Sequence, residues 1–120
     1  MLSVSPVVKI FVYGQAADLR RGYDGLAAIV QESMEEDPLS GSLFVFVNKR
    51  GNRIKLLYWD ETGYAIWMKR LEVGSFELPQ VEDGASPRVQ VTPSQLSLIL
   101  DGIELSSVRR RKRYRLPSAC

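Results

Sequence analysis

The sequence predicts a single α+β domain, in which one long helix packs on an antiparallel β-meander of three to five strands and a second short helix lies near the C-terminus. Two patterns predict it: apolar residues recur at helical spacing before Pro38, and strand-like apolar runs extend from residue 43 to residue 69. A length of 120 residues and 45% apolar residues are ordinary for one globular domain. We assign residues 1–108 to the domain and residues 109–120 to a basic tail, which we expect to be flexible.

The N-terminal part of the domain predicts a strand followed by the long helix. Residues 7–13 are β-branched and aromatic, which favours a strand. The helix begins at Asp18, or at Asp24 as the N-cap because Gly22 and Gly25 interrupt the first turn, and it ends near Pro38. Its apolar face comprises Leu19, Tyr23, Leu26, Ala27, Val30 and Met34.

The central part of the chain predicts the meander. Residues 43–47 and 54–59 form a β-hairpin around the polar turn 48–53, and residues 64–69 add a third strand after a turn at 60–63. Residues 75–79 could add a short edge strand, and residues 80–90 are expected to be loop.

The second helix has clear sequence signals at both ends. Thr92 is the expected N-cap, Pro93 occupies the first helical position and Gly102 is the expected C-cap. The apolar face consists of Leu96, Ile99, Leu100 and Ile103.

The residue types limit the chemistry that this chain can perform. Histidine is absent and Cys120 is the only cysteine, so we expect no disulfide, no metal site and no cofactor. Clustered carboxylates could hold divalent ions for phosphoryl transfer, but the candidates are better explained as caps and turn residues, namely Asp18, Asp24, Asp60 and Asp101. We therefore expect no enzymatic activity and no small-molecule substrate.

Hydropathy and charge bear on location and on partners. No apolar run of 18 residues and no signal peptide are found, so we expect a cytoplasmic protein without membrane contact. Six of the sixteen basic residues fall within seven positions, leaving ten against fourteen acidic residues elsewhere. This block predicts contact with a polyanion, with DNA phosphates as the leading candidate; its members are Arg109, Arg110, Arg111, Lys112, Arg113 and Arg115.

A second basic group surrounds the predicted hairpin turn. Its members are Lys49, Arg50, Arg53 and Lys55. Aromatic residues on the neighbouring strands could stack on bases beside these cations, or could be ordinary core and cross-strand pairs: Tyr58, Trp59, Tyr64 and Trp67. Arg20 and Arg21 could bind an anion at the start of the helix, and ion pairs with Asp18 or Asp24 explain them equally well.

Four segments in order resemble a known family. They are DLRRGYDGL at residues 18–26, DPLSGSLFVF at 37–46, RGNRIKLLYWD at 50–60 and WMKRLE at 67–72. Together they resemble the accessory protein called TnpB, the second open reading frame product, of insertion sequences of the sixty-six class. The resemblance spans roughly residues 8–105.

The resemblance implies a helper that is encoded beside a separate transposase and is needed for efficient transposition. It implies no catalytic activity. Two mechanisms remain open: DNA contact through the tail and the hairpin cations, or an adaptor that docks on the transposase without binding DNA.

Overall fold

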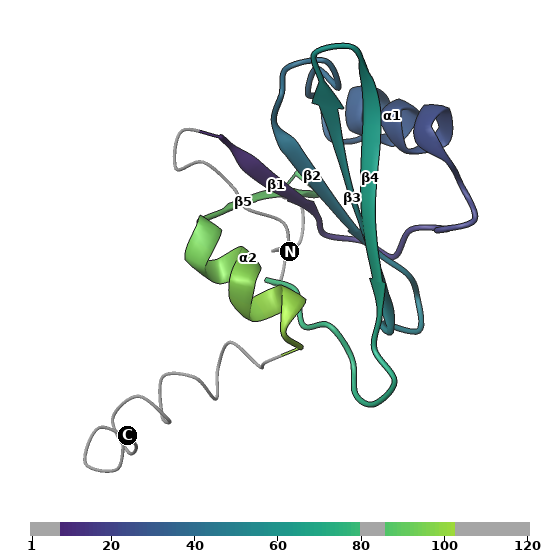
Figure 1. Cartoon of the computed structure of the whole chain (residues 1–120), viewed down its shortest axis with the longest axis vertical. Helices are drawn as coiled ribbons and strands as arrows, with labels where there is room; N and C mark the ends of the chain where they lie inside the picture. Colours follow the sequence, from purple (N-terminus) through teal and green to yellow (C-terminus); the bar gives the residue numbers. More distant parts are fainter. Residues whose placement is uncertain (1–7, 80–85, 103–120) are drawn as a thin grey trace.

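The computed structural model describes residues 8–79 and 86–102, which form one five-stranded sheet with a helix on each face (Figure 1). The strand order is β4-β3-β2-β1-β5. β1 runs parallel to β2, and the other neighbours are antiparallel. The elements are β1 (Ile10–Tyr13), α1 (Tyr23–Glu32), β2 (Leu43–Val47), β3 (Arg53–Asp60), β4 (Gly63–Arg70), β5 (Arg88–Val91) and α2 (Pro93–Leu100).

Each face of the sheet has its own apolar core. On one face, α1 packs through Leu26 and Val30 against Phe11, Phe44 and Leu57. On the opposite face, α2 contributes its two buried side chains to a separate cluster with Ile10, Val45 and Leu56. β2 lies between the two cores and is buried along its whole length, which explains its unbroken apolar sequence.

The predicted hairpins are confirmed. β2 pairs with β3 from Phe44–Leu57 to Val47–Ile54, and β3 pairs with β4 without a break from Asp60–Gly63 to Arg53–Arg70. Because side chains alternate between faces, this register determines which residues of β3 and β4 lie on the α1 side.

The sheet is mixed, so the expectation of a purely antiparallel meander was wrong. α1 connects β1 to β2 as a crossover, and a crossover connection returns the chain in the same direction. β1 begins at Ile10, later than predicted, and position 7 lies outside the described residues.

The first helix is also shorter than predicted, with only 10 residues. Its N-cap is Gly22, which provides no side-chain cap, and Asp24 lies in the first turn, so neither aspartate is the N-cap. At the other end, Glu35 adopts a left-handed conformation (φ 54°) and ends the turn before Pro38 is reached.

The segment between β4 and α2 departs from expectation as well. Residues 75–79 form no strand; Phe76 is buried in the α2-side core instead, and its N–H donates to the Gly51 carbonyl. Within the predicted loop 80–90, residues 88–90 belong to β5, which pairs with β1. Pro87 and the short length of this strand obscured its pattern in the sequence.

The predicted start of the second helix is confirmed, whereas its C-cap is Asp101 and not Gly102, and Ile103 of the predicted apolar face lies outside the described residues. The Thr92 side chain accepts a hydrogen bond from the Gln95 N–H, and the Gln95 side chain accepts one from the Thr92 N–H. Gly102 has φ +72°, the left-handed conformation typical of a glycine after a helix. Within the described ranges, neither helix is long and apolar enough to cross a membrane.

Candidate nucleic-acid interface

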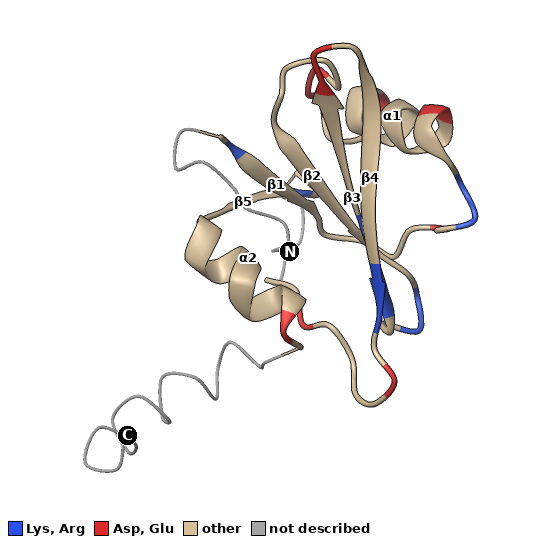
Figure 2. Cartoon of the chain, in the orientation of Figure 1, with Lys and Arg blue, Asp and Glu red and all other residues tan. Residues whose placement is uncertain are grey.

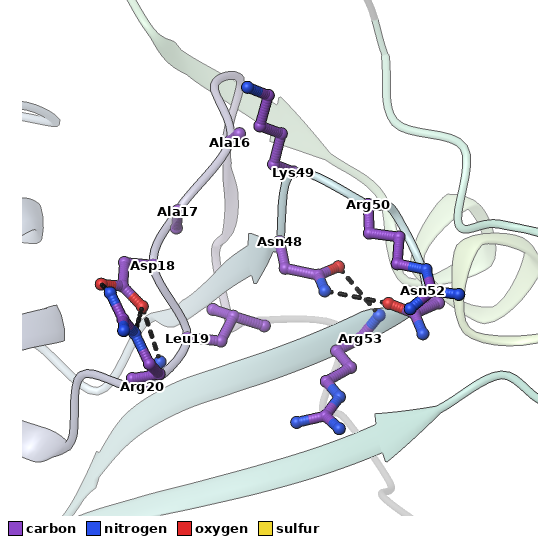
Figure 3. A pocket seen from close by; sticks show the side chains of 10 residues that line it. All are labelled: Ala16, Ala17, Asp18, Leu19, Arg20, Asn48, Lys49, Arg50, Asn52 and Arg53. Atoms are coloured by element: carbon purple, nitrogen blue, oxygen red, sulfur yellow. Dashed lines mark hydrogen bonds and ion pairs between the residues drawn. The ribbon is translucent and has the colours of Figure 1, made fainter.

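The β2–β3 turn that bears Lys49 and Arg50 is held by the side chain of Asn48. Its amide oxygen accepts a hydrogen bond from the Arg53 N–H at 3.0 Å, and its amide nitrogen donates to the Asn52 side chain at 2.9 Å (Figure 3). The turn is therefore ordered by its own polar side chains, and both exposed cations project from a fixed backbone.

The same turn is attached to the chain that follows β4. The carbonyls of Gly51 and Asn52 accept hydrogen bonds from the N–H groups of Phe76 (2.7 Å) and Leu71 (2.8 Å). Gly51 has φ +81°, and a Cβ there would lie 3.1 Å from the Ser75 Cβ. The left-handed backbone favours glycine at this position, and Ser75 leaves little room for a side chain.

Strands β3 and β4 extend the positive charge along the α1 side of the sheet. Arg53 lies opposite Arg70, and Lys55 lies opposite Met68, in the same alternation that places Leu57 and Ile66 against α1. We call this surface the basic face; its residues are Lys49, Arg50, Arg53, Lys55 and Arg70.

Charge is separated along the β3–β4 hairpin. The basic face lies at the end near the β2–β3 turn, whereas Asp60 and Glu61 lie at the opposite end, in the turn between β3 and β4 (Figure 2). The hairpin therefore has a positive and a negative end.

Two hollows adjoin the basic face and share Arg53. One, of about 700 Å³, lies between loop residues 16–20 and the turn residues Lys49 and Arg50 (Figure 3). The other, of about 400 Å³, extends along Lys55, Met68 and Arg70. The loop is attached to the sheet by the Ala17 N–H, which donates to the Val47 carbonyl at 2.9 Å.

Arg20 lies in this loop but is engaged by Asp18. The guanidinium approaches the carboxylate to 2.9 Å, and the Arg20 backbone N–H donates to the same carboxylate. These hydrogen bonds lower the pKa of Asp18 from 3.8 to about 2 and raise the pKa of Arg20. Of the two alternatives for Arg20, anion binding or an ion pair with an aspartate, the structure shows the ion pair with Asp18.

Arg21 has a structural role through its backbone and its aliphatic stem. Its carbonyl accepts a hydrogen bond from Lys55 Nζ at 3.1 Å. A Cβ on Gly25 would lie 2.9 Å from the Arg21 Cβ, so the stem packs on the first turn of α1.

Most cations of the basic face have no carboxylate partner in the part of the chain that the structure describes. The ion pairs found there join Arg20 to Asp18, Arg70 to Glu72 and Arg88 to Glu36. Four positive charges with no such partner therefore stand together: Lys49, Arg50, Arg53 and Lys55.

The aromatic residues do not join these cations to form a stacking platform. Trp59 and Tyr64 pair across the strands, edge to face at 5.1 Å, near the acidic end of the hairpin. Tyr58 and Trp67 pack on the core beneath α2, on the opposite side of the sheet from the basic face. The arrangement is that of cross-strand and core pairs.

Residues 8–110 match the family of IS66 Orf2-like proteins. The chain belongs to this family. Membership confirms the resemblance described above and supports an accessory role in the transposition of insertion sequences of this class.

The IS66 Orf2-like protein has relatives in Sinorhizobium fredii (strain NBRC 101917 / NGR234). The uncharacterized protein y4jC is 38% identical over 111 residues, which are 92% of each chain. The uncharacterized protein y4hO is 36% identical over 104 residues, covering 87% of this chain and 88% of y4hO. No solved structure matches.

The four candidate aspartates of this IS66 Orf2-like protein lie apart in local roles. Asp18 pairs with Arg20, Asp24 lies in the first turn of α1, Asp60 ends β3 and Asp101 is the C-cap of α2. Among residues 8–79 and 86–102, no three acidic or cysteine side chains come together as a metal site would require.

Arg70 is a member of the basic face that the sequence pattern did not identify. Arg70 follows a predicted strand, and only the pairing register reveals that it lies opposite Arg53. All six tail cations, Arg109, Arg110, Arg111, Lys112, Arg113 and Arg115, and also Cys120, lie outside the described residues.

Proposed function

We propose that this IS66 Orf2-like protein is a non-catalytic accessory protein for transposition of a bacterial insertion sequence, and that it acts by binding DNA through the basic face and the basic tail. The observation that supports this most strongly is the basic face itself. The β2–β3 turn and the end of β4, about 20 residues apart in the sequence, bring their cations to one surface.

The electrostatic repulsion among the cations of the basic face indicates that the binding partner is a polyanion. Like charges directly opposite each other on neighbouring strands are destabilising, and Arg53 and Arg70 form such a pair, with Glu72 at 2.9 Å from Arg70 offsetting part of the repulsion. Phosphates would offset this repulsion and release counterions as they bind. Contacts of this kind give affinity without base recognition, so little sequence preference is expected.

The test is a binding titration of the full chain with duplex DNA at several salt concentrations. If all six tail cations met phosphates, the slope of log affinity against log salt would approach about −5, and four further cations of the basic face would bring it to about −9. We expect a clearly negative slope that is shallower than this limit. A slope near zero, or binding that requires one particular sequence, would contradict the proposal.

Single substitutions distinguish DNA binding by the basic face from a general effect of net charge. We expect Arg53→Gln to weaken binding and to reduce the salt slope by about one. Lys9→Gln is the matched control, because it also removes one exposed cation but lies just before β1, beside the start of β2 and so at the end of the sheet opposite the β2–β3 turn. Equal effects of the two substitutions would show that only net charge matters.

The absence of catalysis is tested separately. Supercoiled DNA incubated with the protein and Mg²⁺ or Mn²⁺ should remain uncut, because the aspartates serve as ion-pair, turn and capping residues. Cleavage that Asp24→Asn abolishes would overturn this part of the proposal.

The second candidate function is an adaptor that docks on the transposase. Two exposed apolar side chains favour it: Met68 on the basic face side of β4, 65% exposed, and Val73 just beyond β4, 90% exposed. If the adaptor function holds, Met68→Gln and Val73→Gln together should abolish capture of purified transposase at high salt while leaving DNA binding intact.

A further inference from the structure

β4 is an edge strand of the sheet, and half of its backbone groups point away from β3. The Leu71 N–H donates to the Asn52 carbonyl, and this register continues along the hairpin, so the odd-numbered residues of β4 bond to β3. The N–H and C=O groups of the even-numbered residues therefore face outward. Within residues 8–79 and 86–102, no backbone hydrogen bond uses these groups, which belong to Tyr64, Ile66, Met68 and Arg70.

This edge lacks the features that ordinarily protect an edge strand from pairing with another chain. Its register with β3 runs without a bulge, and its eight residues include no proline. The only charged residues are Lys69 and Arg70 at its end, after the five uncharged residues YAIWM at 64–68. A long, apolar and unpaired edge of this kind is a site at which another strand can be added.

The run YAIWM is complementary to itself in antiparallel pairing. Its centre is Ile66, whose backbone groups point outward, so Ile66 can form a hydrogen-bonded pair with Ile66 of a second copy on a two-fold axis. Tyr64 then lies opposite Met68, and Ala65 lies opposite Trp67. This pairing covers the Met68 side chain, which is 65% exposed in the single chain.

The same register brings opposite charges together. The β3–β4 hairpin has a positive and a negative end, and antiparallel pairing sets each positive end beside a negative end (Figure 2). Lys69 and Arg70 of one copy lie opposite the β3–β4 turn of the other, close to Asp60 and Glu61. Arg70 also pairs with Glu72 of its own chain, but that pair is exposed and therefore weak.

We propose that the protein forms a two-fold dimer in which β4 pairs antiparallel with β4 of a second copy, centred on Ile66. The dimer goes beyond the proposed function, because it does not depend on DNA binding. It joins the two five-stranded sheets into one continuous sheet. Side chains directly opposite each other on neighbouring strands point to the same face, so the basic faces of both copies lie on the same side of this sheet.

The oligomeric state is tested by light scattering after gel filtration of the full chain, for which we expect twice the monomer mass. Met68→Pro removes an outward N–H that the single chain does not use, and proline is tolerated at such positions of an edge strand. We expect this variant to have the monomer mass. Met68→Val is the matched control, because it retains the N–H and favours a strand, and it should remain dimeric. Circular dichroism checks that both variants are folded.

The register is tested by disulfide formation in the full chain with Cys120→Ser, which removes the only native cysteine. Ile66→Cys should give a covalent dimer on oxidation, because the Cα atoms of a hydrogen-bonded antiparallel pair are about 5.5 Å apart, within disulfide range. Met68→Cys is the control: its side chain is more exposed, but the two copies of residue 68 lie about 13 Å apart along the strands. It should form no covalent dimer.

Several outcomes would overturn the dimer. These are a parent chain of monomer mass across a concentration series, a folded Met68→Pro that remains dimeric, and a Met68→Cys that cross-links as readily as Ile66→Cys. A monomeric parent chain whose β4 amides become protected from hydrogen exchange by purified transposase would show that the edge binds the transposase instead. Absence of DNA binding by a dimeric parent chain would overturn the proposed function and leave the dimer in place.

Discussion

At the scale of single residues, the ion pair of Asp18 and Arg20 gives a direct test in solution. We expect the carboxyl carbon of Asp18 to titrate with a pKa of about 2, and Arg20→Gln to return the pKa toward 3.8, because the hydrogen bonds from the guanidinium favour the charged form. An NMR titration between pH 1 and pH 6 measures both values.

The direction of the pH effect follows from the lowered pKa. A carboxyl group whose folded pKa lies below its unfolded pKa stabilises the fold above the unfolded value, near 3.8, and this contribution is lost as the pH falls toward 2. Arg20→Gln should therefore slightly lower the stability of the fold at neutral pH and have little effect on it near pH 2. A normal Asp18 pKa in the parent protein would show that the pair does not persist in water.

Substitutions of Asn48 and Asn52 test whether their side-chain hydrogen bonds stabilise the β2–β3 turn. Asn48→Ala removes two hydrogen bonds, to the Arg53 N–H and to the Asn52 side chain, and should lower the free energy of unfolding by about 1–2 kcal/mol. Asn52→Ala removes only the second and should cost about half as much. Denaturant unfolding measures both, and equal losses would contradict this account of the turn.

At the scale of elements, two glycines at the start of α1 should respond differently to substitution: replacing Gly22 should stabilise the fold, and replacing Gly25 should not. Gly22→Ser should raise the free energy of unfolding by about 0.5–1 kcal/mol, because the N-cap has an extended backbone and no atom within 4 Å of a new Cβ. Gly25→Ala should give no such gain, because its Cβ would meet the Arg21 Cβ at 2.9 Å.

The two helices also show what the sequence can reveal. α2 could be predicted because Thr92, Pro93 and Gly102 are local signals that act within one or two turns of the chain. The start of α1 could not, because its N-cap is a glycine without a capping side chain. Of the two candidates, Asp24 lies in the first turn and Asp18 is bonded to Arg20.

The direction and register of strand pairing were harder to predict from the sequence than the helices. The direction of β1 relative to β2 depends on the crossover through α1, which no pattern within either strand records. For the same reason Arg70 was missed, since its place opposite Arg53 follows from register and not from residue type. The cations of the β2–β3 turn could be identified because hairpin and charge lie in one short segment.

At the scale of the whole molecule, β2 and β3 lie between two cores, so the described domain should unfold as one unit. The two tryptophans test this from opposite faces: Trp59 lies on the α1 side and Trp67 packs on the α2-side core. Trp59→Phe and Trp67→Phe each leave one fluorescent reporter. Both variants should show fluorescence transitions that coincide with loss of helical circular dichroism, whereas two separated transitions would indicate independent units.

The pairing of β1 with β5 has a consequence for synthesis of the chain. β1 (residues 10–13) can pair with β5 only after residues 88–91 have been synthesised, whereas β2, β3 and β4 can pair as soon as each is made. At about 5–20 residues per second, a ribosome needs roughly 4–16 s to pass from one partner to the other. Throughout that interval the nascent chain presents one unpaired edge of the apolar strand β1 to solvent, where it is open to pairing with another chain.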